Sequence, residues 1–141
     1  MKMNPYLKEE LVKELKSISK RMKEEPDPAR KLFLYSAANG ITNRVMRLEF
    51  DSELLLVDTL LNITYNSVNA RLNMFMSGDR IIPVTREILD GLSDCVKDVA
   101  VAIDTGNSCY DILQRMMTMS FLTTGPGHYM GTTGQIPTPG S

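Results

Sequence analysis

The spacing of apolar residues constrains the fold of this chain more than any other feature. Apolar residues recur at intervals of three and four in five consecutive segments, as they do along one face of an α-helix. No segment shows the sustained apolar–polar alternation that is typical of a β-strand. The length of 141 residues suits one domain with a single core. We therefore predict an all-α fold.

Two of the predicted helices begin with the same pair of residue types. Asn4-Pro5 and Asp27-Pro28 each place a capping side chain directly before a proline, and proline suits the first position of a helix because its missing N–H would be unbonded there anyway. A third helix is predicted at residues 52–77. Its apolar residues cover more than half of the helix circumference, which predicts that it is the central helix of the fold.

The second half of the chain adds two more helices and a tail. Thr85 is the predicted N-cap of a fourth helix that ends at Gly106, and Ser108 opens a short fifth helix. Short connections favour antiparallel neighbours, so residues 1–122 should form an antiparallel bundle of four main helices plus the short fifth. Residues 123–141 contain five glycines, three prolines and no charged residue, which predicts a flexible C-terminal tail.

Composition and charge exclude several classes of function. The net charge of −1 offers no basic field for nucleic acid, and no apolar run is long enough to cross a membrane. The two cysteines match no zinc or disulfide pattern. Residues 1–50 carry a net charge of +4 and residues 51–141 a net charge of −5, which suits docking of one half on the other. We expect a cytoplasmic homodimer that binds no membrane, with another protein as a further candidate partner and with nucleic acid disfavoured as one.

A row of asparagines marks one face of the third predicted helix. The row consists of Asn62, Asn66, Asn69 and Asn73, at spacings of four, three and four. Asparagine is a mediocre helix former, but neutral amides can pair between helices without the desolvation cost of charges, and a buried asparagine can fix helix register. Asn39 and Asn43 on the second helix are candidate partners in such a polar seam or interface. Two other interpretations stay open, a solvated stripe and the lining of a ligand pocket.

Acidic residues mark one face of the fourth predicted helix. Glu87, Asp90 and Asp94 are followed by Asp98, at spacings of three, four and four. Carboxylates one turn apart can hold Mg²⁺ together with substrate phosphates, and Asp58 is the only nearby candidate on another helix for an additional ligand. The spacing of the first two is similar to the paired acidic motifs of helical nucleotide pyrophosphatases. The simpler interpretation is a solvated charged face.

These patterns support three functional hypotheses. The first is a non-enzymatic bundle that acts as a homo-oligomeric interaction or scaffold protein and needs no cofactor. The second is a Mg²⁺-dependent nucleotide (pyro)phosphohydrolase that uses the acidic residues, and the third is a small-molecule-binding bundle that uses the asparagine row. The only histidine, His128, lies in the glycine-rich tail without a recognisable nucleophile, so it predicts no catalytic triad.

Overall fold

The computed structural model describes residues 3–77 and 83–124. In that part of the chain all regular secondary structure is helical, which confirms the predicted all-α class. The five helices are α1 (Pro5–Glu24), α2 (Pro28–Leu48), α3 (Ser52–Ser77), α4 (Pro83–Thr105) and α5 (Tyr110–Thr124). The predicted tail begins within α5, which includes Thr123 and Thr124, and its remaining residues lie outside the described ones.

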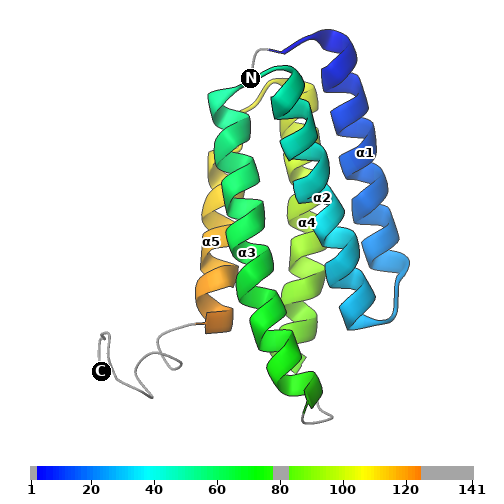
Figure 1. Cartoon of the computed structure of the whole chain (residues 1–141), viewed down its shortest axis with the longest axis vertical. Coiled ribbons are helices and arrows are strands. Elements are labelled where there is room, and N and C mark those ends of the chain that lie inside the picture. Colours follow the sequence, from blue (N-terminus) through cyan, green and yellow to red (C-terminus); the bar gives the residue numbers. More distant parts are fainter. Residues whose placement is uncertain (1–2, 78–82, 125–141) are drawn as a thin grey trace.

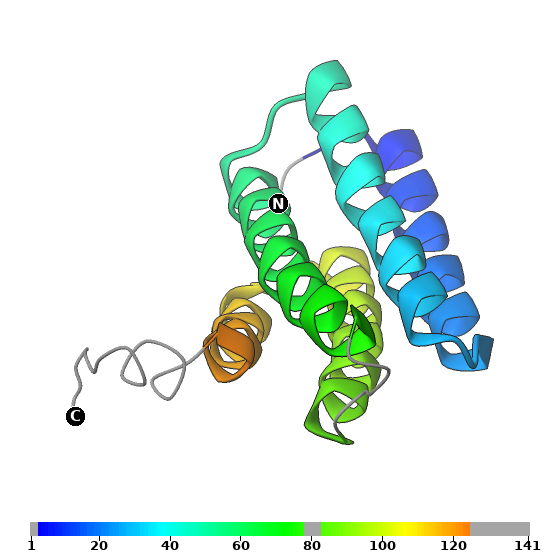
Figure 2. The ribbon, with the colours of Figure 1, turned by 60° about the horizontal axis from the view of Figure 1, so that its bottom comes forward.

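The helices form a bundle in which α4 lies behind α2 and α3 (Figure 1). Helix α1 packs against α2 and α4, α2 packs against α3, and α5 joins α3 to α4 on the other side. Figure 2 shows the same arrangement from below. Short connections make α1 and α2 antiparallel neighbours, and likewise α2 and α3, as predicted, whereas α3 and α5 run in the same direction (Figure 1).

Side-chain caps begin the first three helices. The carboxamide oxygen of Asn4 accepts a hydrogen bond from the backbone N–H of Tyr6 at 2.8 Å. A carboxylate oxygen of Asp27 accepts one from Arg30 at 3.0 Å, and Asp51 accepts one from the N–H of Leu54 at 3.0 Å. Each cap supplies an acceptor to N–H groups that have no partner within the helix. The predicted starts of the first three helices are therefore confirmed.

The ends of α4 differ from each other in how well the sequence predicts them. Gly106 has a φ of 75°, and the N–H of Asn107 reaches back to the carbonyl of Ala102 at 2.8 Å, so the predicted glycine stop is confirmed. The predicted N-cap Thr85 is wrong, because α4 already begins at Pro83. Proline is compatible with the first turn of a helix, so α4 can begin at Pro83, and Thr85 then lies within the first turn rather than before it.

Helix α4, rather than α3, is the central helix. It contacts all four other helices, whereas α3 contacts three, and ten of its described residues are buried. Its buried side chains are Ile88, Leu89, Leu92, Ser93, Cys95, Val96, Val99, Ala100, Ala102 and Ile103. Helix α3 keeps one side open to solvent. The prediction from apolar circumference was therefore wrong, because the bundle does not cover all the apolar residues that α3 carries.

Two buried serines join α1 to α4. The hydroxyl of Ser19 donates to the carbonyl of Ser93 at 2.8 Å, and the hydroxyl of Ser93 donates to the carbonyl of Ser19 at 2.9 Å. Each side chain thus bonds to the backbone of the opposite helix, which requires the two backbones to lie close together. Small side chains permit that approach, and the reciprocal bonds satisfy both hydroxyl donors.

Candidate interaction surface

A buried carboxylate lies between α2 and α3. One oxygen of Asp58 accepts hydrogen bonds from the Asn39 amide at 2.7 Å and from the Thr42 hydroxyl at 2.6 Å. Its other oxygen lies 3.5 Å from the Asn43 amide nitrogen. Asn39 and Asn43 therefore do contact the third helix, but they bind Asp58 rather than the asparagine row. These bonds replace water around a carboxylate that is almost fully buried.

Tyr35 adds a second polar contact to the same helix pair. Its buried hydroxyl donates to the carbonyl of Leu61 at 3.2 Å. Burial raises the pKa of Tyr35 well above its ordinary value of 10.0, so the phenol stays neutral. The bonds of Asp58 and Tyr35 thus join α2 to α3 at specific positions, which favours one register of the two helices.

The first two residues of the asparagine row face solvent rather than another described helix of the same chain. Asn62 and Asn66 are exposed, and Asn69 is half-buried. The side chain of Asn73 is not among the side chains that the structure describes. Their role in an interface between two chains stays a prediction.

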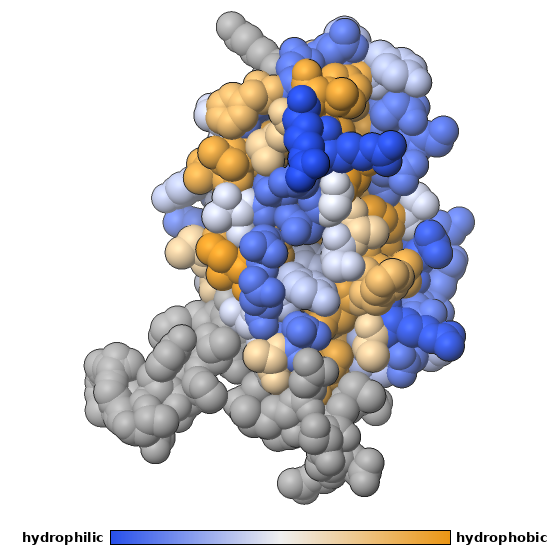
Figure 3. Space-filling view, viewed as in Figure 1, coloured by the Kyte–Doolittle hydropathy of each residue, from blue (hydrophilic) through white to orange (hydrophobic). Residues whose placement is uncertain are grey.

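The exposed part of α3 carries no charge between Ser52 and Ala70. The exposed side chains in this stretch, here called the α3 outer face, are Ser52, Leu55, Leu56, Thr59, Asn62, Ile63, Asn66 and Ala70. Leu56 is 57% exposed and Ile63 is 47% exposed, so large apolar side chains lie beside the two exposed asparagines. Figure 3 shows apolar residues exposed on the α3 side of the molecule, whereas the edge formed by α1 is mostly hydrophilic.

The exposure of Leu55, Leu56 and Ile63 was not predicted from the sequence. The signal that could have revealed it is the wide spread of apolar residues around the third helix. Leu55 and Ile63 lie on the same side of the helical wheel as Asn62 and Asn66. When apolar residues lie on both sides of the asparagines on the helical wheel, some of them face away from the core and can form a second packing surface.

The acidic residues of α4 pair with basic residues of neighbouring helices. Asp94 contacts Lys23 of α1, and this hydrogen-bonded contact raises the pKa of the Lys23 ammonium group. Lys31 of α2 lies 3.5 Å from Asp90. Asp98, one turn further along, binds Arg115 of α5 at 2.7 Å. All of these pairs are at least partly exposed, so each contributes little to stability.

The structure does not gather the predicted magnesium ligands into one site. Asp58 lies on the contact between α2 and α3, whereas Asp90 and Asp94 face lysines of α1 and α2. Glu87 is exposed on α4. Among the described residues, no three His, Cys, Asp or Glu side chains are placed so that they could hold a metal ion. Magnesium binding stays a prediction without supporting geometry in this part of the chain.

Both cysteines are free thiols in the core. Burial is the main cause that raises the pKa of Cys95, and likewise that of Cys109, from 9.0 to about 11. A thiolate is the nucleophilic form of cysteine, so these thiols are poor nucleophiles near neutral pH.

Two surface hollows lie away from the asparagine row. One, of about 470 Å³, lies between the end of α1 and the start of α2. The other, of about 390 Å³, lies between α4 and α5. Neither is lined by an asparagine of the row. The hypothesis of an amide-lined ligand pocket therefore finds no support in these two hollows.

Comparison with known proteins gives no relative. No family model matches the chain, and neither a curated protein nor a solved structure resembles it significantly. None of the helices in the described part of the chain has the length and apolarity needed to span a membrane.

Proposed function

We propose that this protein is a non-enzymatic helical bundle that acts by pairing with a second copy of itself through the α3 outer face. The observation that carries the proposal is the composition of that face. From Ser52 to Ala70 its exposed side chains are all uncharged, and three of them are large and aliphatic. Depletion of charge is the usual mark of an interface core.

An uncharged face suits pairing of identical chains. In a two-fold dimer the same surface of each chain meets its copy, so any charge at the centre would meet a like charge. The α3 outer face avoids that repulsion. Leu56 and Ile63 would lose contact with water, which stabilises association by roughly 25 cal/mol for each Å² of apolar surface buried. Asn62 and Asn66 could pair across the axis through their amides.

The size of the face indicates a reversible dimer. Residues 52–70 span about 27 Å at 1.5 Å per residue, which is the length of one helix-to-helix contact. A contact between single helices buries less surface than a permanent dimer needs. We therefore expect a dimer that dissociates on dilution. The two free, buried cysteines support a location in the cytoplasm, where thiols stay reduced.

Site-specific cross-linking tests the proposal. The native thiols are buried, so a cysteine introduced at an exposed position is the thiol that reacts first with a short bis-maleimide. We expect cross-linked dimers from Asn66→Cys and from Thr59→Cys on the α3 outer face. The matched control Ser17→Cys, exposed on α1, should remain monomeric. Equal yields from all three variants, or no dimer from either α3 variant, would contradict the proposal.

A further inference from the structure

Helix α2 has a charge pattern unlike that of any other surface helix in the described part of the chain. It contains four basic residues and no Asp or Glu. Lys31 is engaged within the bundle, because it donates to the carbonyl of Met22 at 2.6 Å and lies near Asp90. The other three are Arg30, Arg44 and Arg47, all exposed. By contrast, the exposed side of α1 carries charges of both signs, with Glu9, Glu14 and Glu24 among its basic residues.

The three arginines have no anionic partner within the described residues. No hydrogen bond or ion pair of the Arg30, Arg44 or Arg47 side chain occurs there. Arg47 lies in the last turn of α2, where the helix dipole favours a cation, so its position has a structural explanation. Arg30 lies in the first turn, where the dipole disfavours one. The dipole of α2 therefore does not account for Arg30, and its exposed guanidinium is open to an external anion.

Apolar and small residues lie between these arginines. Together with Arg30, Arg44 and Arg47 they form the surface here called the α2 outer face, which also contains Ala29, Phe33, Ala37, Gly40 and Leu48. Phe33 is 72% exposed. A Cβ atom placed on Gly40 would meet no atom within 4 Å, so the middle of this face is open to the approach of another backbone.

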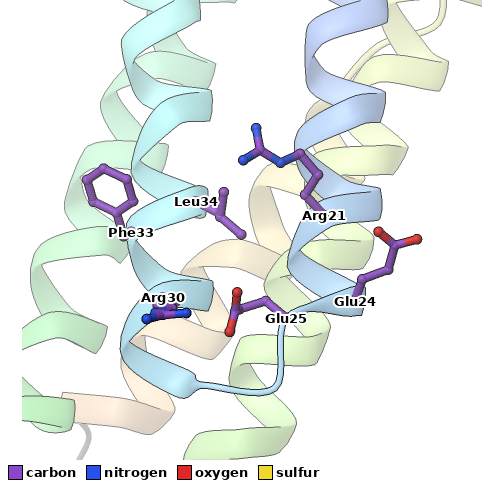
Figure 4. Close-up of a pocket in the computed structure, with 6 residues that line it drawn as sticks. All are labelled: Arg21, Glu24, Glu25, Arg30, Phe33 and Leu34. Atoms are coloured by element: carbon purple, nitrogen blue, oxygen red, sulfur yellow. The ribbon is translucent and has the colours of Figure 1, made fainter.

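A hollow adjoins the first turn of α2. Figure 4 shows Arg21 extending from α1 toward Leu34, with Phe33 on the outer side of α2 and Arg30 one turn below. Glu24 and Glu25 complete the lining. The hollow can receive an apolar side chain flanked by two guanidinium groups. The two glutamates would repel a continuous chain of phosphates but not a polypeptide whose carboxylates are spaced apart.

We propose that the α2 outer face binds an acidic, partly apolar helical segment of another protein. The positive charge of the face calls for carboxylates on the partner, and Phe33 and the hollow call for an apolar side chain among them. Residues 30–47 span about 26 Å, which matches a partner helix of about 17 residues. This surface is distinct from the α3 outer face, so the proposal does not depend on dimer formation.

A synthetic peptide provides the probe. Its sequence should form an amphipathic helix of about 18 residues with glutamates on one side and leucine and phenylalanine on the other, and it carries a fluorophore for anisotropy measurements. The comparison probes are the same peptide with lysine in place of glutamate, and a single-stranded oligonucleotide. We expect saturable binding of the acidic peptide, weakened by added salt, and no binding of the lysine peptide.

Charge-reversal variants identify the surface. Arg30→Glu combined with Arg44→Glu should weaken binding of the acidic peptide by about tenfold or more. Lys13→Glu combined with Lys20→Glu makes the same change in net charge on the exposed side of α1 and should weaken it less than about threefold. Phe33→Ala should weaken binding without changing its salt dependence, because it removes apolar contact only.

Three results would overturn the proposal. One is the absence of saturable peptide binding to the full chain. Another is an equal loss of peptide affinity in the α1 control and the α2 variant, which would mean that net charge alone determines binding. The third is tighter binding of the oligonucleotide, with the same sensitivity to the α2 variant, which would make the face a nucleic-acid surface.

Discussion

Asp58 lies almost fully buried between α2 and α3, with neighbours that were not predicted from the sequence. It was a candidate metal ligand because its carboxylate could add to those of the fourth helix. In the folded chain its hydrogen bonds come from two amides and a hydroxyl of α2. The role of Asp58 in the fold is to join two helices through neutral donors.

Removal of the Asp58 carboxylate should destabilise the fold. We expect Asp58→Ala to lower the free energy of unfolding by about 1–3 kcal/mol, because the Thr42 hydroxyl and the Asn39 amide lose a buried acceptor. Glu14→Ala, which removes an exposed carboxylate on α1, should change it by less than about 0.5 kcal/mol. Urea denaturation of the two variants measures the difference, and equal values would contradict the structural role of Asp58.

At the scale of elements, helices with one apolar face were predicted well. The stripes through Leu11 and Leu15 in α1, and through Leu92 and Val96 in α4, are buried. Each of these helices has only one orientation that buries its stripe. Helix α3 has apolar residues on both sides of its asparagines, so periodicity alone does not say which side faces the core. The neighbours of Asp58 depend on the packing of α2 against α3, which spacing within one helix does not determine.

The contact between α1 and α4 permits a sharp test of element packing. Ser19→Leu should lower the free energy of unfolding by about 1–3 kcal/mol, because a larger side chain must separate two closely packed helices and both serine–backbone bonds are lost. The same change at exposed Ser17 on α1 is the matched control and should stay within about 0.5 kcal/mol. Equal midpoints in thermal denaturation would show that the helices are not closely packed there.

At the scale of the whole molecule, the five helices leave two surfaces of different character. The α3 outer face is uncharged and suits a second copy of the chain. The α2 outer face is positively charged and suits an acidic partner. The acidic side chains of α4 are mostly paired with Lys23, Lys31 and Arg115 of other helices, whereas Arg30, Arg44 and Arg47 of α2 make no ion pair within the described residues.

Sedimentation equilibrium over a range of protein concentrations tests the pairing of two chains through α3 most directly. The wild-type chain should pass from the monomer mass of 15.8 kDa toward twice that value as concentration rises. Leu56→Glu combined with Ile63→Glu should remain monomeric, because two copies of the face would then bring carboxylates together. Val101→Glu, an exposed apolar position on α4, should dimerise like the wild type. A wild-type chain that stays monomeric at every concentration, or dimers that persist in the α3 variant, would contradict this account.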